Sequence, residues 1–222
     1  MSSVKCLSCG LVNFGTQSEC RRCGAALRLD CGDGGDANPR GGLKKKIAKS
    51  ALRIFALAGS LLFIGYASLI ATSDPARLEQ KPFIDRAIEI LETKGFAREA
   101  FVLRHIVRFR ASDNWWNRKV GHESAYAATN FPFEVVTLYP PFFDQPVDDV
   151  ERASILLHEA SHLLGSGEHG AFESAWRRKT QLGWTRDKYE SSLVWTNVRE
   201  ATMQYAPELF QCGQDHRSDC VE

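Results

Sequence analysis

The longest uncharged run in the chain extends from Ile54 to Ala71 and is almost entirely apolar. As a helix with a rise of about 1.5 Å per residue it would measure about 27 Å, close to the thickness of the hydrocarbon core of a bilayer. A buried helix of a soluble domain usually carries a polar stripe, whereas the polar residues of this run are Ser60, Tyr66 and Ser68. The pattern therefore predicts a transmembrane helix over residues 51–72.

Beyond this run, the spacing of apolar residues predicts a folded body over residues 73–222. Apolar positions recur with helical spacing between residues 76 and 110, and Gly95 divides them into two helices. Residues 134–139, EVVTLY, are β-branched and aromatic and end at a Pro-Pro pair, which is typical of a strand.

A central helix is predicted over residues 150–164, where Asp148 or Asp149 can cap the first turn. The segments 175–184 and 194–210 are helical in pattern as well. We therefore expect an α+β domain that is mostly helical and contains a small sheet.

Charge is distributed unevenly about the apolar run. The formal net charge is +1, but residues 1–53 contain ten Lys and Arg against four Asp and Glu, and Lys44–Lys46, Lys49 and Arg53 directly precede the run. The positive-inside rule then places the N-terminus in the cytoplasm. About fifty residues precede the run, more than the leader of a cleaved signal peptide, so we expect an uncleaved signal anchor. The predicted location is the cell (inner) membrane, crossed once, with a periplasmic or extracellular C-terminal domain.

The N-terminal residues 1–30 contain two Cys-x-x-Cys-Gly turns separated by ten residues. Two such turns supply four thiolates, which is the ligand set of a structural tetrahedral zinc site. A segment this small cannot bury an adequate core, so metal binding would supply most of its folding free energy. The predicted ligands are Cys6, Cys9, Cys20 and Cys23.

This segment resembles the short zinc ribbons that begin many bacterial membrane proteins. It is also similar in spacing to RanBP2-type zinc fingers, C-x2-C-x3-N-x6-C-x2-C, with Asn13 as the asparagine. Those fingers usually carry a Trp two residues before the first Cys, where this chain has Val4. The missing Trp weakens the inference of RNA or ubiquitin binding from this resemblance, and nucleic acid is not an expected partner. A cytoplasmic protein that binds the ribbon is an open alternative.

Residues 31–50 are rich in Gly, Asp and Pro and then in Lys, and their first part has no apolar periodicity. This composition predicts a flexible basic linker between ribbon and membrane. At the other end of the chain, Cys212 and Cys220 lie on the opposite side of the apolar run. An isolated pair suits an oxidising compartment and predicts a disulfide, although two free thiols would give the same sequence pattern.

The segment His158-Glu159-Ala160-Ser161-His162 lies within the predicted central helix. Histidines at i and i+4 share one helical face, so both rings can bind one catalytic zinc ion. Zinc lowers the pKa of a bound water, Glu159 accepts its proton, and the resulting hydroxide attacks a carbonyl polarised by the metal. The pattern therefore predicts a hydrolase of peptide bonds whose general base is Glu159.

A catalytic zinc site commonly has a third protein ligand and keeps one position for water. Glu168, His169 and Glu173 are the candidates. With Phe172 and Ala175 facing the core, Glu168 falls on the buried stripe of its helix and Glu173 near the edge of that stripe.

The run HEASHLLGSGE resembles the metzincin pattern HExxHxxGxxH, with Gly165 as the turn glycine and Glu168 in the place of the third His. The helix that starts at Glu168 is also similar to that of gluzincin peptidases, in which small residues follow the ligand Glu at +3 and +7. Both resemblances imply Glu168 as the ligand, with His169 and Glu173 as alternatives. They also imply a zincin-like fold, in which residues 134–139 would be the edge strand that holds an extended peptide substrate.

These observations together predict a membrane-anchored zinc-dependent metallopeptidase acting on a peptide or protein substrate. It would contain two zinc ions, one structural in the ribbon and one catalytic in a zincin-like domain over residues 73–222. The alternative is a non-catalytic, membrane-tethered sensor or interaction protein in which the HExxH zinc is structural and the ribbon binds a cytoplasmic partner.

Overall fold

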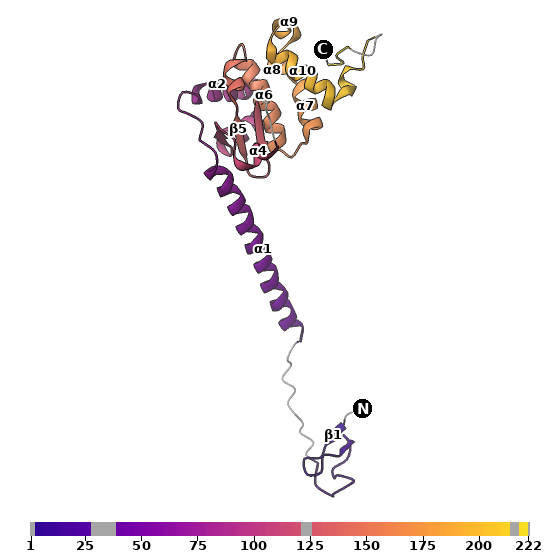
Figure 1. The fold of residues 1–222 in the computed structure, drawn as a ribbon. Helices are drawn as coiled ribbons and strands as arrows, with labels where there is room; N and C mark the ends of the chain where they lie inside the picture. The colour runs from indigo at the N-terminus through magenta and orange to yellow at the C-terminus, as the bar shows by residue number, and fades with distance from the viewer. Residues whose placement is uncertain (1–2, 28–38, 121–125, 214–217, 222) are drawn as a thin grey trace. The chain divides into compact units, whose positions relative to one another are not determined.

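The computed structural model describes residues 3–27, 39–120, 126–213 and 218–221 (Figure 1). The chain forms two units, Met1–Phe55 and Ala56–Glu222. It is mostly helical with two small sheets. Residues 31–38 of the predicted linker, which include Cys31, lie outside the described residues.

The first unit begins with a two-stranded antiparallel sheet of β1 (Ser3–Lys5) and β2 (Val12–Phe14). Its small core consists of Cys6, Cys20 and Leu27. A core of this size cannot hold the segment folded without a further source of stability, as the sequence indicated.

The helix α1 (Pro39–Ala71) follows, and its stretch Ala48–Ala71, which contains an 18-residue window with a mean hydropathy of 2.1, is long and apolar enough to cross a membrane. The helix starts earlier than we predicted: residues 39–50, which we expected in the flexible linker, belong to α1. Lysine, alanine and leucine are good helix formers, so the basic segment continues the apolar helix in the N-terminal direction.

In the second unit, α2 (Lys81–Thr93) and α3 (Ala97–His105) confirm the two helices predicted on either side of Gly95. The helical prediction is wrong for residues 108–110, which form β3 (Arg108–Arg110). This strand pairs in parallel with β5 (Val135–Leu138), and long-range pairing of this kind overrides local apolar spacing.

The sheet of this unit has the strand order β3-β5-β4, with β4 (Ala127–Asn130) antiparallel to β5. The strand predicted from EVVTLY is therefore present as β5, but its prediction as the edge strand is wrong. All four residues of β5 are buried, as expected for a strand with a neighbour on each side. The edge strands are β3 and β4, and β4 is the one that packs against α6.

The helix α6 (Asp149–Leu163) packs against β4 and the helices around it (Figure 1). Asp148 is its N-cap and accepts hydrogen bonds from the amides of Val150 and Glu151. Eleven residues of α6 are buried, as expected for a helix at the centre of a domain. Its side chains are therefore held in fixed positions. The remaining elements are α4 (Trp115–Val120), α5 (Pro140–Asp144), α7 (Glu168–Arg177), α8 (Lys179–Leu182), α9 (Arg186–Tyr189), α10 (Leu193–Tyr205) and the 3-10 helix η1 (Pro207–Phe210).

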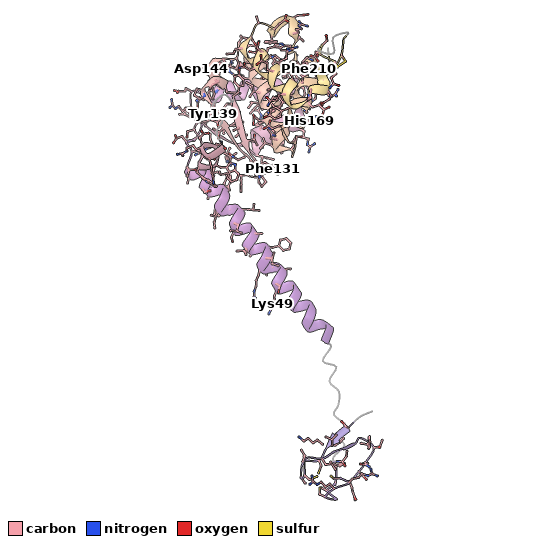
Figure 2. The ribbon with its side chains drawn as sticks, turned by 45° about the vertical axis from the view of Figure 1, so that its right-hand side comes forward. Lys49, Phe131, Tyr139, Asp144, His169 and Phe210 are labelled. Atoms are coloured by element: carbon pink, nitrogen blue, oxygen red, sulfur yellow. A yellow bond between two sulfur atoms is a disulfide. The ribbon has the colours of Figure 1, made fainter. Side chains whose placement is uncertain are left out.

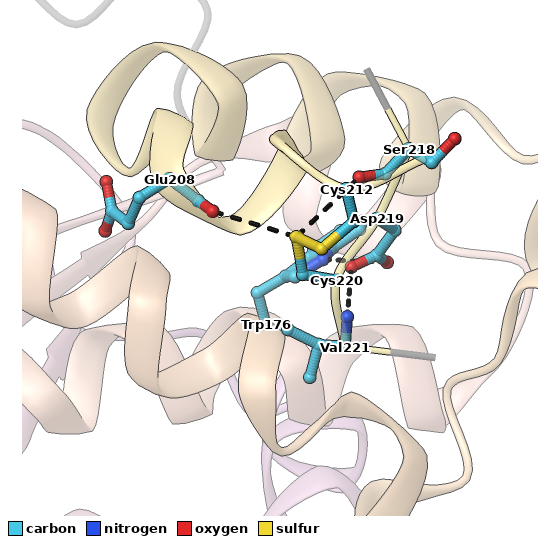
Figure 3. Close-up of a disulfide and its surroundings, with 7 residues drawn as sticks. All are labelled: Trp176, Glu208, Cys212, Ser218, Asp219, Cys220 and Val221. Carbon is cyan, nitrogen blue, oxygen red and sulfur yellow. Dashed lines mark hydrogen bonds between the residues drawn. A yellow bond between two sulfur atoms is a disulfide. The ribbon is translucent and has the colours of Figure 1, made fainter. Parts of the chain in front are cut away.

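The C-terminal segment is tied to the body by a disulfide between Cys212 and Cys220 (Figure 3). Next to it, Asp219 accepts a hydrogen bond from the indole of Trp176 at 3.0 Å. Asp219 also forms an ion pair with the buried Lys179 at 2.9 Å. The end of the chain is therefore packed onto α7 and α8.

Candidate functional site

Two histidines of α6 point their rings toward one location. His158 and His162 lie one helical turn apart, and their Nε2 atoms are 3.1 Å from each other. The rings are nearly perpendicular, with centroids 4.7 Å apart. Two basic ring nitrogens this close repel one another unless a proton or a cation lies between them.

Glu168 reaches the same location from the first turn of α7. The helix α6 ends at Leu163 and α7 starts at Glu168, so only four residues separate them. Gly165 has a φ of 95° and makes this short reversal possible, because residues with a side chain rarely adopt that conformation. The Oε2 atom of Glu168 lies 3.6 Å from Nε2 of His158 and 3.5 Å from Nε2 of His162.

This donor set fits a zinc ion. Zinc binds histidine nitrogen and carboxylate oxygen at about 2.0–2.2 Å, so two tetrahedral ligand atoms lie about 3.3–3.6 Å apart. The three measured separations, 3.1, 3.5 and 3.6 Å, are within a few tenths of an ångström of that value. Two histidines and one carboxylate leave a fourth position for water or substrate, as in catalytic zinc sites.

The rings of the two histidines are held in different ways. Nδ1 of His162 lies 2.9 Å from the carbonyl of Ser166, and because a carbonyl only accepts, Nδ1 carries the hydrogen and Nε2 is left free for a metal. Nδ1 of His158 is buried without a hydrogen-bond partner among the described residues. The His158 ring instead packs on Phe172, with centroids 4.2 Å apart.

The electrostatics of the site favour a cation. Burial lowers the pKa of His162, but Glu168, Glu159 and the Ser166 carbonyl raise it to about 9. In return, contacts with His158 and His162 lower the pKa of Glu168 far below its usual range. The site therefore attracts a positive charge, which a proton supplies in the absence of a metal.

Glu159 lies beside the histidines and is almost fully buried, with 5% of its surface exposed. The hydroxyl of Thr129 on β4 donates a hydrogen bond of 2.6 Å to its Oε2. A carboxylate that accepts such a bond is fixed in orientation, and its other oxygen stays available. The general base predicted from the sequence is thus held between α6 and the edge strand.

A cleft of about 780 Å³ contains this site. Its walls come from β4, α6, α7 and α10. Tyr205 lines the cleft and stacks on Phe172, with centroids 5.1 Å apart. Tyr189 does not line the cleft: it is buried and donates a hydrogen bond of 2.7 Å to Asp148, so its role is structural.

The two alternative third ligands lie elsewhere. His169 is on the outer side of α7, and its Nε2 is 2.8 Å from Oε1 of Glu208 (Figure 2). Glu173 forms an ion pair of 2.8 Å with Arg177 on the same helix. Of the three candidates, Glu168 is the one that lies with the histidines. The prediction that it falls on the buried stripe of its helix is wrong, because 52% of its side chain is exposed against 33% for Glu173. Glu168 stands in the first turn of α7 and lines the open cleft.

The four cysteines of the N-terminal unit also converge. Their sulfurs all lie within 4.8 Å of one another, with Cys6 and Cys23 3.6 Å apart and Cys9 and Cys20 3.5 Å apart. Zinc–sulfur bonds of about 2.3 Å place tetrahedral ligands about 3.8 Å apart. The cluster could therefore hold one metal ion.

The two cysteine turns have matching backbone hydrogen bonds. Gly10 donates to the carbonyl of Cys6 and Gly24 to that of Cys20, each at 2.9 Å. The backbone amide of Arg22 is the first of several contacts that lower the pKa of Cys20 to about 6. A hydrogen bond from Leu11 favours the Cys9 thiolate, but burial and the neighbouring sulfurs raise its pKa to about 12. The close sulfurs thus oppose deprotonation of Cys9, and a bound cation would remove this repulsion.

Comparisons of the chain with protein-family models, with curated proteins and with solved structures found no match. The function proposed below therefore rests on the geometry of the two sites.

Sequence reasoning missed two residues of the site. Thr129 lies in a short strand with little periodicity, and its contact with Glu159 spans thirty residues. Phe172 was recognised as a core residue, but its packing on the ring of His158 was not anticipated. The spacing of the chain carries no signal for either contact.

Proposed function

We propose that the chain is a membrane-anchored, zinc-dependent peptidase whose active site is formed by His158, Glu159, His162 and Glu168. One observation carries the proposal: the two histidines and Glu168 converge at zinc-ligand spacing directly beside a buried carboxylate, in a cleft bordered by an edge strand. A group of metal ligands alone would support a structural metal as well, but the adjacent Glu159 supports hydrolysis.

Each residue has a role in this proposal. His158, His162 and Glu168 would hold zinc, which supplies Lewis acidity that acidifies water and polarises a carbonyl. Glu159 accepts a proton from water and later donates it to the leaving amine of the cleaved peptide. Thr129 keeps the Glu159 carboxylate oriented through its hydrogen bond. The burial of Glu159, which is 5% exposed, strengthens its charge interactions.

The edge strand supports a peptide as the substrate. One side of β4 pairs with β5, and its residues Ala127–Thr129 line the cleft. The free side of an edge strand offers unpaired amide and carbonyl groups, to which an extended peptide can add as a further strand. A peptide in that position would pass close to Glu159.

The anchoring part of the proposal rests on α1 and on the cysteines. The helix is long and apolar enough to cross a membrane, and five basic residues precede its uncharged part. The four clustered thiols suit a reducing compartment, whereas the disulfide Cys212–Cys220 suits an oxidising one. Both arguments support a topology in which the N-terminal unit is cytoplasmic and the body lies outside the cytoplasm.

The test is zinc stoichiometry and casein cleavage by the full chain in detergent. We expect two zinc ions per chain in wild type, one in His158→Ala and in Glu168→Gln, and two in Glu159→Gln, which should cleave nothing. His169→Ala and Glu173→Gln are matched controls on the surface of α7 and should retain both zinc ions and full cleavage. Full zinc content without cleavage in wild type would instead favour a zinc-stabilised sensor or interaction protein.

A further inference from the structure

The C-terminal turns of α1 are not free but packed against the body. The ring of Phe133 covers Gly65 so closely that a Cβ added there would lie 3.0 Å from it. The indole of Trp115 donates a hydrogen bond of 3.0 Å to Ser68, and Leu69 is buried. The body therefore begins to cover α1 two turns before the helix ends.

Two arginines hold the end of the helix in place. The guanidinium of Arg118 donates to the carbonyl of Thr72 at 2.8 Å, and that of Arg110 donates to the carbonyls of Ile70, at 2.8 Å, and Ser73. The last carbonyls of a helix lack partners within the helix and carry a partial negative charge, so positively charged donors there are favourable. These contacts fix the last turns of α1, from Gly65 on, against the body.

The length of α1 places this junction at the surface of the bilayer. Its uncharged part, Ile54–Ala71, is about 27 Å long at about 1.5 Å per residue and nearly fills a hydrocarbon core of about 30 Å. Phe133 and Trp115 cover residues 65–68, which lie about 5–9 Å from the C-terminal end of this part. Both rings thus lie in the outermost hydrocarbon, next to the headgroups.

Four aromatic side chains lie next to this junction. Trp115 and Trp116 pack edge to face at 5.4 Å and expose 43% and 51% of their surfaces. Phe131 exposes 60% and belongs to the same turn between β4 and β5 as Phe133. Figure 2 shows Phe131 at the end of the body from which α1 leaves. Tryptophan is enriched at membrane interfaces, where an apolar ring and a polar edge are both accommodated.

Phe131 connects this surface to the cleft, because it also lines the cleft wall. It directly follows β4, whose Thr129 contacts the general base Glu159. At about 3.3 Å per residue, Phe131 and Thr129 are about 7 Å apart along the strand. The catalytic groups are therefore only a few residues of extended chain away from the aromatic surface.

We propose that the aromatic side chains of Trp115, Trp116, Phe131 and Phe133 rest on the lipid interface, and that the cleft takes extended segments of other membrane-anchored chains where these leave the bilayer. This inference rests on the proposed peptidase function and names its substrate class. A segment entering past Phe131 and pairing with β4 would be cleaved within about ten residues of its own membrane span.

The membrane contact is tested by tryptophan fluorescence of the full chain in vesicles of phosphatidylcholine and phosphatidylglycerol. Trp176, Trp184 and Trp195 are buried in the core, so quenching by lipids brominated on the upper acyl carbons reports on Trp115 and Trp116. We expect partial quenching in wild type and its loss in the double variant Trp115→Phe, Trp116→Phe. Equal fluorescence in brominated and unbrominated vesicles would overturn the membrane contact.

The substrate class is tested with a degenerate peptide library, prepared as free peptides and as stalks fused to an apolar span of about 20 residues. Stalks are reconstituted with the full chain in the same vesicles, and cut positions are mapped by mass spectrometry. Sharing a membrane raises the local concentration of any substrate, so the position of the cuts, and not their number, is the readout. We expect at least about tenfold more cuts in the first ten residues of the stalk than in the rest.

Trp116→Ser should spread the cuts along the stalk and leave cleavage of free peptides unchanged, because Trp116 does not line the cleft. Leu193→Ser is the control, since Leu193 is 51% exposed at the start of α10, and it should keep the wild-type distribution. An even distribution of cuts in wild type, with free peptides cleaved as well, would overturn the inference and leave the peptidase function intact. Cleavage of neither substrate form would refute the peptidase function and the substrate class together.

Discussion

The hydroxyl of Thr129 on the edge strand β4 donates a hydrogen bond of 2.6 Å to the carboxylate of Glu159 on the central helix α6. This contact joins the strand that would hold a substrate to the group that would move its protons. Strand and base therefore cannot shift independently, which is what preorganised catalysis requires.

Removal of this hydrogen bond is expected to slow catalysis without loss of metal. A hydrogen bond to a charged group contributes about 1.5–3 kcal/mol, so Thr129→Val should lower kcat by about 10- to 100-fold. Thr129→Ser restores the hydroxyl and should recover most of the rate. Steady-state kinetics with zinc analysis checks this, and equal zinc loss in both variants would contradict a role in orienting Glu159.

The parts of the site that depend on local sequence could be predicted. The spacing of His158 and His162 implies one helical face, and Asp148 was one of two predicted caps for that helix. The edge strand could not be predicted, because the order β3-β5-β4 depends on parallel pairing between Arg108–Arg110 and residues 135–137. An apolar strand has the same sequence whether it lies at the edge of a sheet or in its centre.

The sequence could narrow the third zinc ligand only to three candidates. Glu168, His169 and Glu173 lie within six residues of each other, and the choice depends on where the chain reverses after α6. The conformation of Gly165 decides it, since it directs the first turn of α7 toward the histidines. The spacing of residues along a helix gives no information about the direction in which that helix starts.

Substitution of Gly165 should therefore weaken zinc binding. Gly165 has a φ of 95° and no neighbour within 4 Å of an added Cβ, so Gly165→Ala introduces backbone strain and no collision. The strain, about 1 kcal/mol or more, should displace Ser166 and Glu168 and raise the Kd for zinc by about tenfold.

Gly167→Ala is the matched control for this prediction. Gly167 also has no neighbour within 4 Å, but its φ is −77°, which any residue adopts. Its zinc affinity should stay close to that of wild type. Competition with a chelating dye gives both constants, and an equal loss of affinity in the two variants would show that the turn conformation is not the cause.

The disulfide Cys212–Cys220 should contribute measurably to the stability of the body. It closes a loop with a sequence separation of 8, for which the chain-entropy model gives about 2.5 kcal/mol at 25 °C. The double variant Cys212→Ser, Cys220→Ser should lose about that amount in urea unfolding. A reducing agent should shift wild type to the midpoint of the variant and leave the variant unchanged; a shift in both would mean that reduction acts elsewhere.

Acid should destabilise the protein in part through Asp148. Burial raises the pKa of this carboxyl, but the Tyr189 hydroxyl, the Glu151 amide and Lys188 lower it below its usual value overall. A carboxyl whose folded pKa is depressed contributes stability above its unfolded pKa and loses it as pH falls through the folded one. The N-cap of α6 is thus strongest at neutral pH.

Asp148→Ala should cost about 1–2 kcal/mol of unfolding free energy at pH 7, the usual effect of removing an N-cap. The difference between variant and wild type should shrink below about pH 4, where Asp148 of the unfolded chain takes up a proton before the folded carboxyl, whose pKa is lower, does so. Asp148→Asn retains a capping oxygen without the charge and should lie between the two at pH 7. Urea unfolding at several pH values measures this, and a difference that stays constant into acid would mean that the charge of Asp148 contributes nothing to the cap.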